Sequence, residues 1–299
     1  RMISYFRKPN FVFFGSPEFA AIILEKLIAA GMPPALVVCN PDRPFGRKRT
    51  LTAPPVKQLV LETRNMKLET TGRQVIPEIL QPERLDASFA LHVSRLKPDF
   101  AIVAAYAKIL PLDIIKLPRL GAIGVHPSLL PKYRGATPIQ SAILAGETET
   151  GVTLFMLDKK VDHGPILANR KLQIANGETY DTLMKELGGL SGNLLIETLP
   201  AFIAGNIAPQ AQNEAAATYT KKFTTEDGFV DLQKDPPELV ARKIRALNPA
   251  PGVYAFIEKN ARRIRVKLLA AHLTDGKLSP TLIQAEGKKP RAVRGMEDV

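Results

Sequence analysis

GAIGVHPSLLPKYRGATPIQ, over Gly121–Gln140, and GVTLFMLDKKVDHGP, over Gly151–Pro165, are the stretches from which the rest of the chain is interpreted. His126 is the one histidine of four that lies in a sharp turn next to apolar, strand-like residues. Asp162 closes the second stretch beside Gly164, a residue that lets backbone approach a ligand closely. A carboxylate near a histidine fixes its tautomer and stabilises its charged form, so this pair is a candidate for acid–base catalysis. A structural histidine at a strand end remains the alternative.

The N-terminal pattern predicts a doubly wound α/β sheet. Asn10–Gly15 is typical of a short buried strand that ends in a turn, and Ser16 is placed to cap a helix that stops at Gly31. A second strand is predicted over Leu36–Cys39. This β-α-β unit predicts a Rossmann-like parallel sheet with right-handed crossovers. The first turn lacks the G-x-G-x-x-G pattern, which argues against a nicotinamide dinucleotide site.

Further periodic segments divide the chain into two domains. Residues 1–205 form the first, and an Ala-, Gln- and Asn-rich segment over 206–222 is predicted as a linker. In residues 223–299 short strands surround one helix, which predicts a small β-barrel. The predicted helices cover Leu59–Thr70, Leu85–Leu96, Thr137–Gly146, Thr179–Gly205 and Pro237–Leu247; the later strands cover Thr153–Leu157, Ile166–Ile174, Phe229–Leu232, Val253–Ile257, Arg263–Ala271 and Leu282–Ala285. Thr71–Ile79 is predicted as a surface loop, and Lys288–Val299 as an exposed, poorly ordered tail.

Composition narrows the function classes. The chain has 299 residues, 45% of them hydrophobic and 23% charged, which is ordinary for a globular protein. A net charge of +12 favours a polyanionic partner, although a generally basic proteome would give the same balance. A single cysteine, Cys39, excludes an intrachain disulfide and a cysteine-rich zinc site. We see no membrane-spanning run and no signal-peptide core, and Arg1 before Met2 suggests an added residue.

A basic loop over Asn40–Arg49 is the clearest candidate for nucleic-acid contact. It carries two prolines, one glycine and four basic residues within seven positions. A solvated surface loop is the plain interpretation. The functional one is a finger whose cations contact phosphates and whose aromatic side chain stacks on a terminal base pair. The residues concerned are Arg43, Phe45, Arg47, Lys48 and Arg49, and Lys57 continues the pattern.

HPSLLPKYRGATPIQ resembles the signature of the 10-formyltetrahydrofolate-dependent formyltransferases. The GSPEF turn, the PDRPFGRKR loop and the TYTKKF segment before the second domain are similar to the branch that formylates methionyl-tRNA. The resemblance covers about Phe11 to Lys289. It implies a formyltransferase domain followed by an OB-like tRNA-binding domain. It also implies 10-formyltetrahydrofolate as co-substrate, no metal, and initiator methionyl-tRNA as acceptor.

The resemblance also implies roles for individual residues. The family's core triad is Asn, His and Asp, which corresponds here to Gly124, His126 and Asp162. The basic loop would enter the acceptor end of the tRNA. The folate would lie beside a set of residues from three segments: Ile109, Leu110, Ser128, Leu129, Leu130, Pro131 and Asp158. Plain core packing is the alternative for Ile109 and Leu110.

Gly124 is the one departure from the family's triad. Formyl transfer needs a group that moves a proton, a carboxylate that orients it and a donor to the developing oxyanion. We expect the first two from His126 and Asp162, both on loops at the carboxyl ends of parallel strands. The family's Asn amide supplies the third, and the loss of such a donor typically costs about 100- to 1000-fold in rate. We therefore expect reduced activity.

Two other functions stay open from the sequence. One is a related formyltransferase or formyltetrahydrofolate hydrolase that acts on a small molecule and needs neither the basic loop nor the second domain. The other is a catalytically silent homologue that binds tRNA or folate, as the missing Asn side chain at Gly124 suggests. We expect a monomer in the cytoplasm, with an organellar matrix as the alternative compartment.

Overall fold

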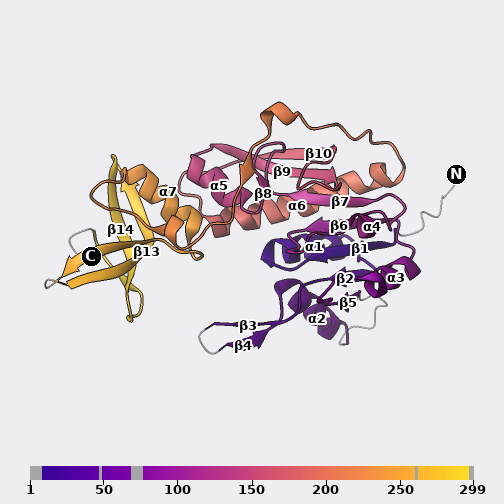
Figure 1. The fold of residues 1–299 in the computed structure, drawn as a ribbon, viewed down its shortest axis with the longest axis horizontal. Coiled ribbons are helices and arrows are strands. Elements are labelled where there is room, and N and C mark those ends of the chain that lie inside the picture. Colours follow the sequence, from indigo (N-terminus) through magenta and orange to yellow (C-terminus); the bar gives the residue numbers. More distant parts are fainter. Residues whose placement is uncertain (1–8, 47–48, 69–76, 260–261, 296–299) are drawn as a thin grey trace. The chain divides into compact units, whose positions relative to one another are not determined.

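The computed structural model describes residues 9–46, 49–68, 77–259 and 262–295, and it divides into two compact units (Figure 1). The first unit comprises the chain up to Arg134, Gly151–Leu172 and Lys185–Ala217. The second comprises Gly135–Thr150, Gln173–Met184 and the chain from Thr218 onward. Segments far apart in the sequence therefore build each unit.

The first unit is built on a seven-stranded sheet in the order β10-β9-β7-β6-β1-β2-β5. The strands β1, β2, β5, β6 and β7 run parallel, and β9 pairs antiparallel with β7. The bounds are β1 Phe11–Gly15, β2 Leu36–Val38, β5 Glu78–Leu80, β6 Phe100–Ala104, β7 Ala122–His126, β9 Glu149–Met156 and β10 Ile166–Gln173. This arrangement confirms the predicted α/β class with a largely parallel sheet.

Helices cover both faces of this sheet. Val12 and Phe14 of β1 point into a core with Phe89 of α3 (Ala87–Arg95) and Ile114 of α4 (Leu112–Ile115). On the other face, Phe11 stacks on Phe100 at a centroid distance of 4.9 Å, and Phe100 meets Phe202 edge-on. That face is covered by α1 (Glu18–Ala29) and α6 (Tyr180–Ile203). Both faces of β1 are buried, as expected for a parallel strand between two helical layers.

The turn from β1 into α1 differs from the predicted capping. Pro17, not Ser16, is the N-cap residue, and no side chain caps the helix. The Ser16 hydroxyl instead accepts a hydrogen bond of 2.9 Å from the Asn40 backbone N–H, which fastens the turn to the end of β2. The predicted end at Gly31 also lies two residues beyond the last helical residue, Ala29. Tertiary contacts therefore decide this turn more than local capping does.

The basic loop contains a small hairpin that the sequence pattern did not predict. β3 (Arg43–Phe45) pairs antiparallel with β4 (Thr50–Thr52), and α2 (Pro55–Leu68) follows directly. The predicted surface loop was also wrong at its end, because Glu78–Leu80 forms the edge strand β5 beside β2. The earlier part of that prediction, residues 71–76, lies outside the described residues.

After β7, the helices α5 and α6 agree with the predicted elements, whereas β8, β11 and the 3-10 turn η1 were not predicted. The short β8 (Arg134–Gly135) pairs with β11 (Tyr219–Thr220), and α5 covers Pro138–Ala145. One continuous helix, α6, occupies the stretch predicted to hold one or two helices. Between α6 and β11 lies a single 3-10 turn, η1, over Glu214–Ala216.

The second unit contains a four-stranded antiparallel sheet in the order β12-β13-β14-β15, with α7 (Pro237–Leu247) packed on it and on α5. The helix has the predicted bounds, and the predicted C-terminal β domain is confirmed. The strand bounds are β12 Tyr254–Lys259, β13 Arg262–Thr274, β14 Lys277–Ala285 and β15 Arg291–Ala292.

Two predictions in this unit were wrong. Phe229–Leu232 is not a strand, because Glu226–Gly228 forms a 3-10 turn, η2, and Phe229 makes one isolated bridge to Tyr254. Part of the predicted loose tail is ordered, because β15 pairs with β14 and buries Val293. Residues 296–299 lie outside the described residues. In the part of the chain that the structure describes, no helix is long and apolar enough to span a membrane.

Gly15 is required where β1 turns into α1. A Cβ atom built there would lie 2.6 Å from the Ala20 Cβ and 2.9 Å from the Ala104 carbonyl oxygen. We predict that Gly15→Ala lowers the free energy of unfolding by about 1–3 kcal/mol through overpacking, measured by urea denaturation. The matched control is Gly189→Ala in α6, where the nearest atom is 3.6 Å away; it should be neutral or slightly stabilising. Equal effects of the two substitutions would contradict this account.

Candidate active site

His126 is the last residue of β7 and its side chain is buried. Its Nε2 lies 2.8 Å from the Tyr133 carbonyl oxygen, which can only accept, so Nε2 is the protonated nitrogen in that contact. Its Nδ1 lies 3.6 Å from an Asp162 carboxylate oxygen. That separation is an ion-pair contact, longer than a normal N–H···O hydrogen bond. Nδ1 is therefore the ring nitrogen placed to exchange a proton beside a carboxylate.

Asp162 reaches His126 by a different route from the one predicted. It lies in the loop after β9, a strand that is antiparallel to β7, so it does not extend from the carboxyl end of a parallel strand. The loop folds back tightly: a Cβ on Gly164 would lie 1.8 Å from the Met156 carbonyl oxygen. Asp162 itself has a φ of 48°, a strained value for a residue other than glycine. The contact predicted between these two side chains is present, although its topology was wrong.

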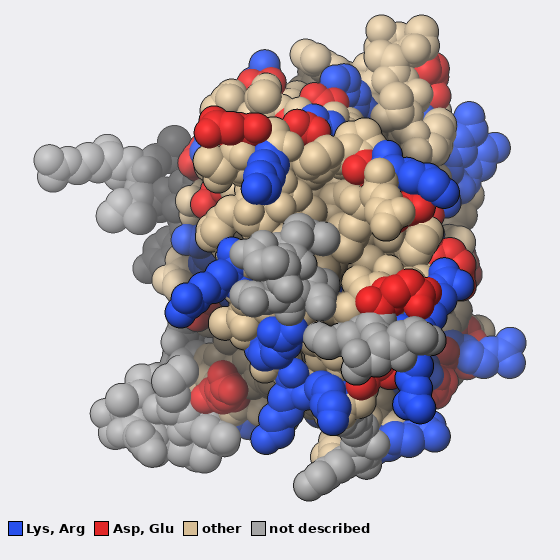
Figure 2. Space-filling model, turned by 90° about the vertical axis from the view of Figure 1, so that its left-hand side faces the viewer, with Lys and Arg blue, Asp and Glu red and all other residues tan. Residues whose placement is uncertain are grey.

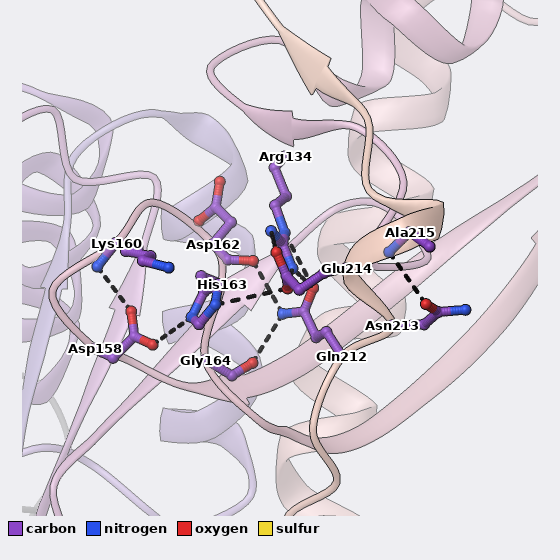
Figure 3. Close-up of polar contacts among 10 residues, drawn as sticks. All are labelled: Arg134, Asp158, Lys160, Asp162, His163, Gly164, Gln212, Asn213, Glu214 and Ala215. Carbon is purple, nitrogen blue, oxygen red and sulfur yellow. Dashed lines mark hydrogen bonds and ion pairs between the residues drawn. The ribbon is translucent and has the colours of Figure 1, made fainter.

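A chain of polar contacts holds this loop (Figure 3). The Arg134 side chain is fully buried and donates to the side-chain oxygens of Gln212 and Glu214. Gln212 in turn donates to the carbonyl oxygens of Asp162 and Gly164, at 3.0 and 2.8 Å. The sequence pattern pointed to none of these roles, because Arg134 and Gln212 lie 78 positions apart.

His163 connects the ends of the same loop. Its Nδ1 lies 2.6 Å from Asp158, and its Nε2 lies 3.6 Å from Glu214 (Figure 3). Asp158 also accepts from the Lys160 backbone N–H at 2.8 Å. The Asp158 carboxylate is thus engaged within its own loop, while the prediction concerned the backbone near Asp158 as a wall of the folate pocket.

Gly124 faces a space that is already filled. It pairs with Phe155 across β7 and β9, and a Cβ on Gly124 would lie 2.4 Å from two ring atoms of Phe155 and 2.7 Å from the Leu157 Cδ1. Phe155 is buried, with 4% of its surface exposed. The missing side chain therefore leaves no gap, because a neighbouring aromatic ring occupies its place.

The other residues predicted to bind folate have different surroundings. The Ser128 hydroxyl is buried and donates to the Lys132 carbonyl oxygen at 2.6 Å, closing the turn after His126. Leu110 belongs to the hydrophobic core cluster under α4, whereas Ile109 has 86% of its side chain exposed. The peptide before Pro131 is cis, and Leu130 is buried with its N–H donating to Thr153, while Leu129 and Pro131 are half-buried.

The residues predicted to contact tRNA are described only in part. Arg43 is exposed on β3, with one guanidinium nitrogen 4.0 Å from Glu83, and Arg49 is exposed with a φ of 49°. Phe45 lies on β3, and the structure does not describe its side chain. Arg47 and Lys48 lie outside the described residues.

Lys57 does not extend the basic loop as predicted. Its ammonium group donates to both carboxylate oxygens of Asp42 and to the side chain of Gln81. The Gln81 and Lys57 hydrogen bonds hold the pKa of Asp42 below its usual range. Lys57 therefore anchors the base of the hairpin.

Neither a reactive thiol nor a metal-binding group is found among the described residues. The Cys39 thiol is buried, and desolvation raises its pKa to about 11, so it is a poor nucleophile at neutral pH. The described residues hold no group of three or more His, Cys, Asp or Glu side chains that could bind a metal ion.

On the face drawn in Figure 2, Lys and Arg side chains are spread with acidic side chains between them. Charge on that face alone therefore does not mark a nucleic-acid site.

Comparison with known proteins shows the family to which the chain belongs. Residues 9–199 match the family described as formyl transferase, and residues 222–295 match its C-terminal domain. The methionyl-tRNA formyltransferase of Halorhodospira halophila is 40% identical over 89% of this chain and 80% of its own length. That of Thermotoga maritima is 42% identical over 88% of this chain and 79% of its own length.

Solved structures share the fold at low sequence identity. The methionyl-tRNA formyltransferase from Clostridium thermocellum gives a TM-score of 0.57 at 16% identity and covers 96% of this chain and all of its own. HypX from Aquifex aeolicus, crystallised with tetrahydrofolic acid, gives a TM-score of 0.63 at 16% identity over 98% of this chain and 47% of its own. These two likenesses concern the fold alone.

We predict that Gly124→Asn destabilises the protein by about 1–3 kcal/mol, because its Cβ and amide must displace the Phe155 ring. Urea denaturation measures the effect. A double-mutant cycle with Phe155→Ala tests the cause. Gly124→Asn should destabilise the Phe155→Ala protein less than it destabilises the parent, because the ring that it displaces is gone. Additive effects, or a single variant as stable as the parent, would refute the steric interpretation.

A pH dependence follows from Glu214. The hydrogen bond from Arg134 holds the pKa of its carboxyl below the ordinary value of 4.5. A lowered folded-state pKa gives stability that is complete above pH 4.5 and is lost as the pH falls through the folded-state value. We predict that the stability deficit of Glu214→Gln, measured by urea denaturation from pH 7 to pH 3, shrinks below about pH 4.5.

The control for Glu214→Gln is Glu197→Gln, which breaks a surface pair with Arg170. Its deficit should be small throughout, because both partners are solvent-exposed. A Glu214→Gln deficit that stayed constant down to pH 3 would contradict the assignment.

Proposed function

The chain belongs to the formyl transferase family, and on that premise we propose that it transfers the formyl group of 10-formyltetrahydrofolate to the amino group of methionyl initiator tRNA. The observation that carries the proposal is the His126–Asp162 contact at the end of β7, where a histidine nitrogen and a carboxylate lie 3.6 Å apart. Relatives about 40% identical over most of the chain are methionyl-tRNA formyltransferases, which supports the choice of acceptor.

His126 moves the proton in this proposal. The amine must lose a proton as its nitrogen bonds to the formyl carbon, and the folate nitrogen must gain one as its bond to that carbon breaks. The Nδ1 atom accepts the first proton and returns it to the leaving nitrogen. Its Nε2 stays on the Tyr133 carbonyl oxygen and keeps the ring in place. Asp162 stabilises the transient imidazolium at 3.6 Å.

The site lacks the side-chain donor that stabilises the oxyanion in the family. Gly124 offers no amide, and Phe155 occupies the space where one would lie. The loss of one oxyanion donor typically costs about 100- to 1000-fold in rate. We therefore propose an enzyme slower than relatives that keep the Asn.

The two matched regions suggest a division of labour. We assign catalysis to residues 1–205 and tRNA contact to the basic loop and to residues 223–299, with 206–222 between them. The matches over 9–199 and 222–295 support this division. Exposed cations such as Arg43 and Arg49 would meet phosphates, which position an RNA without reading its sequence. The reaction belongs in the compartment that holds charged initiator tRNA, which is the cytoplasm in a bacterium.

The folate would lie along the turn after His126. Ser128, Leu129, Leu130 and Pro131 shape this turn, and the exposed Ile109 side chain is available to an apolar ring. Leu110 supports that segment from the core, and Asp158 holds the facing loop through His163.

The experiment measures formyl transfer from 10-formyltetrahydrofolate to charged initiator methionyl-tRNA, with methionine amide as a small-molecule acceptor in parallel. We predict transfer to the tRNA, and a loss of about 100- to 10,000-fold in kcat for His126→Asn. The control is His92→Asn on α3, a histidine paired with Glu78 outside the site, which should leave kcat unchanged.

The outcomes separate the candidate functions. Transfer to methionine amide but not to tRNA would favour a small-molecule formyltransferase. Binding of tRNA and folate without transfer would indicate a catalytically silent homologue. Full activity in His126→Asn would refute the assigned role of the histidine.

A further inference from the structure

We propose that Gln212, in the segment predicted as a linker, is a positioning residue that holds Asp162 against His126. The proposal rests on the function assigned to that pair. Gln212 is 50 positions from Asp162 in the sequence, and its amide donates at 3.0 Å to the Asp162 carbonyl oxygen (Figure 3). The same amide donates at 2.8 Å to the Gly164 carbonyl oxygen. It thus holds the backbone on both sides of His163.

The orientation of this amide is determined by its partners. Carbonyl oxygens only accept and a guanidinium only donates, so the amide nitrogen faces the loop and the amide oxygen faces Arg134. The Gln212 oxygen accepts from the Arg134 Nε at 3.1 Å and from the Nη2 at 2.7 Å. Both donors and both acceptor sites of the amide are used. A side chain with 9% of its surface exposed and all its hydrogen bonds made has one stable position.

Arg134 fixes the other end of this arrangement. Its side chain has no exposed surface, and its charge is balanced by Glu214 through two hydrogen bonds of 3.0 and 2.6 Å. A guanidinium paired in this bidentate way has a defined plane and direction. The amide of Gln212 is therefore held between a rigid cation and the loop.

The segment that carries Gln212 is itself fastened to the sheet. Gln210 and Ile166 exchange two backbone hydrogen bonds, at 2.7 and 2.8 Å, where β10 begins. The segment with Gln210 and Gln212 therefore contacts the loop between β9 and β10 at two places: within the loop, at Asp162 and Gly164, and just after it, at Ile166.

The loop needs such support because of its conformation. Asp162 is held at a φ of 48°, a region that residues other than glycine adopt only when their surroundings impose it. Its side chain must also stay at ion-pair distance from a ring at the end of a different strand. Without the two carbonyl contacts, the loop can relax to a lower-energy backbone and move the carboxylate away from Nδ1.

Two substitutions test this role. Gln212→Met keeps the length of the side chain and removes its hydrogen bonds. Gln212→Glu keeps an acceptor for Arg134 but turns a second oxygen toward the two carbonyl oxygens, which repel it. The matched control is Gln210→Met, the same change at an exposed side chain of the same segment, which leaves the backbone bridge to Ile166 intact.

We expect kcat to fall about 10- to 100-fold in both Gln212 variants, because small misplacements of a catalytic group cost factors of this size. The KM values for folate and tRNA should stay within about twofold, since Gln212 contacts neither reacting group directly. A KM that rises with unchanged kcat would overturn the proposal. In an Asp162→Asn background, Gln212→Met should add little further loss, whereas additive losses would show that it does not act through Asp162.

Hydrogen exchange of the intact protein tests the positioning without any assay of activity. Backbone amides of residues 158–164 should exchange about tenfold faster or more in both Gln212 variants, and at the parent rate in Gln210→Met. If the parent transfers no formyl group, the proposed function fails and this measurement alone decides the role of Gln212. Unchanged exchange in the Gln212 variants would overturn it in either case.

Discussion

Burial of the Arg134 guanidinium is the constraint on which the loop between β9 and β10, residues 157–165, depends. Removing a cation from water costs several kcal/mol unless its hydrogen bonds and its charge are satisfied. Gln212 and Glu214 accept from Arg134 and so require residues 206–217 to lie beside the loop after β9. The same guanidinium directs the Gln212 amide toward the carbonyl oxygens of Asp162 and Gly164. One buried charge thus holds three segments together: the chain at Arg134, the segment with Gln212 and Glu214, and the loop with Asp162.

The sheet contributes the second half of the site. β7 ends at His126 and brings its ring to the Tyr133 carbonyl oxygen, while β9 runs back beside β7 and places Phe155 over Gly124. The antiparallel pairing puts the loop after β9 at the opposite end of β7 from His126, so that loop must fold back to deliver Asp162. A glycine at 164, a strained Asp162 and the Gln212 contacts are the structural means by which it does so.

The sequence predicted the fold class, α7 and the pairing of His126 with Asp162, because each depends on a local pattern or a specific motif. It did not predict the hairpin of β3 and β4, since the two prolines and the glycine of Asn40–Arg49 indicate an irregular loop. Gln212 gave no signal, because an exposed linker glutamine and a buried one look alike without the position of Arg134. Lys57 was misassigned because a lysine near a basic loop gives no hint of its contact with Asp42.

The role of His126 as the proton-transfer group is best examined in a crystal structure of the chain with a stable analogue of 10-formyltetrahydrofolate. We expect the analogue's atom that replaces the formyl-bearing folate nitrogen to lie within about 3.5 Å of the His126 Nδ1, with Asp162 still beside the ring. We also expect the Phe155 ring to remain over Gly124. An analogue bound away from His126, or a His126 ring turned from Asp162 in the complex, would contradict that role.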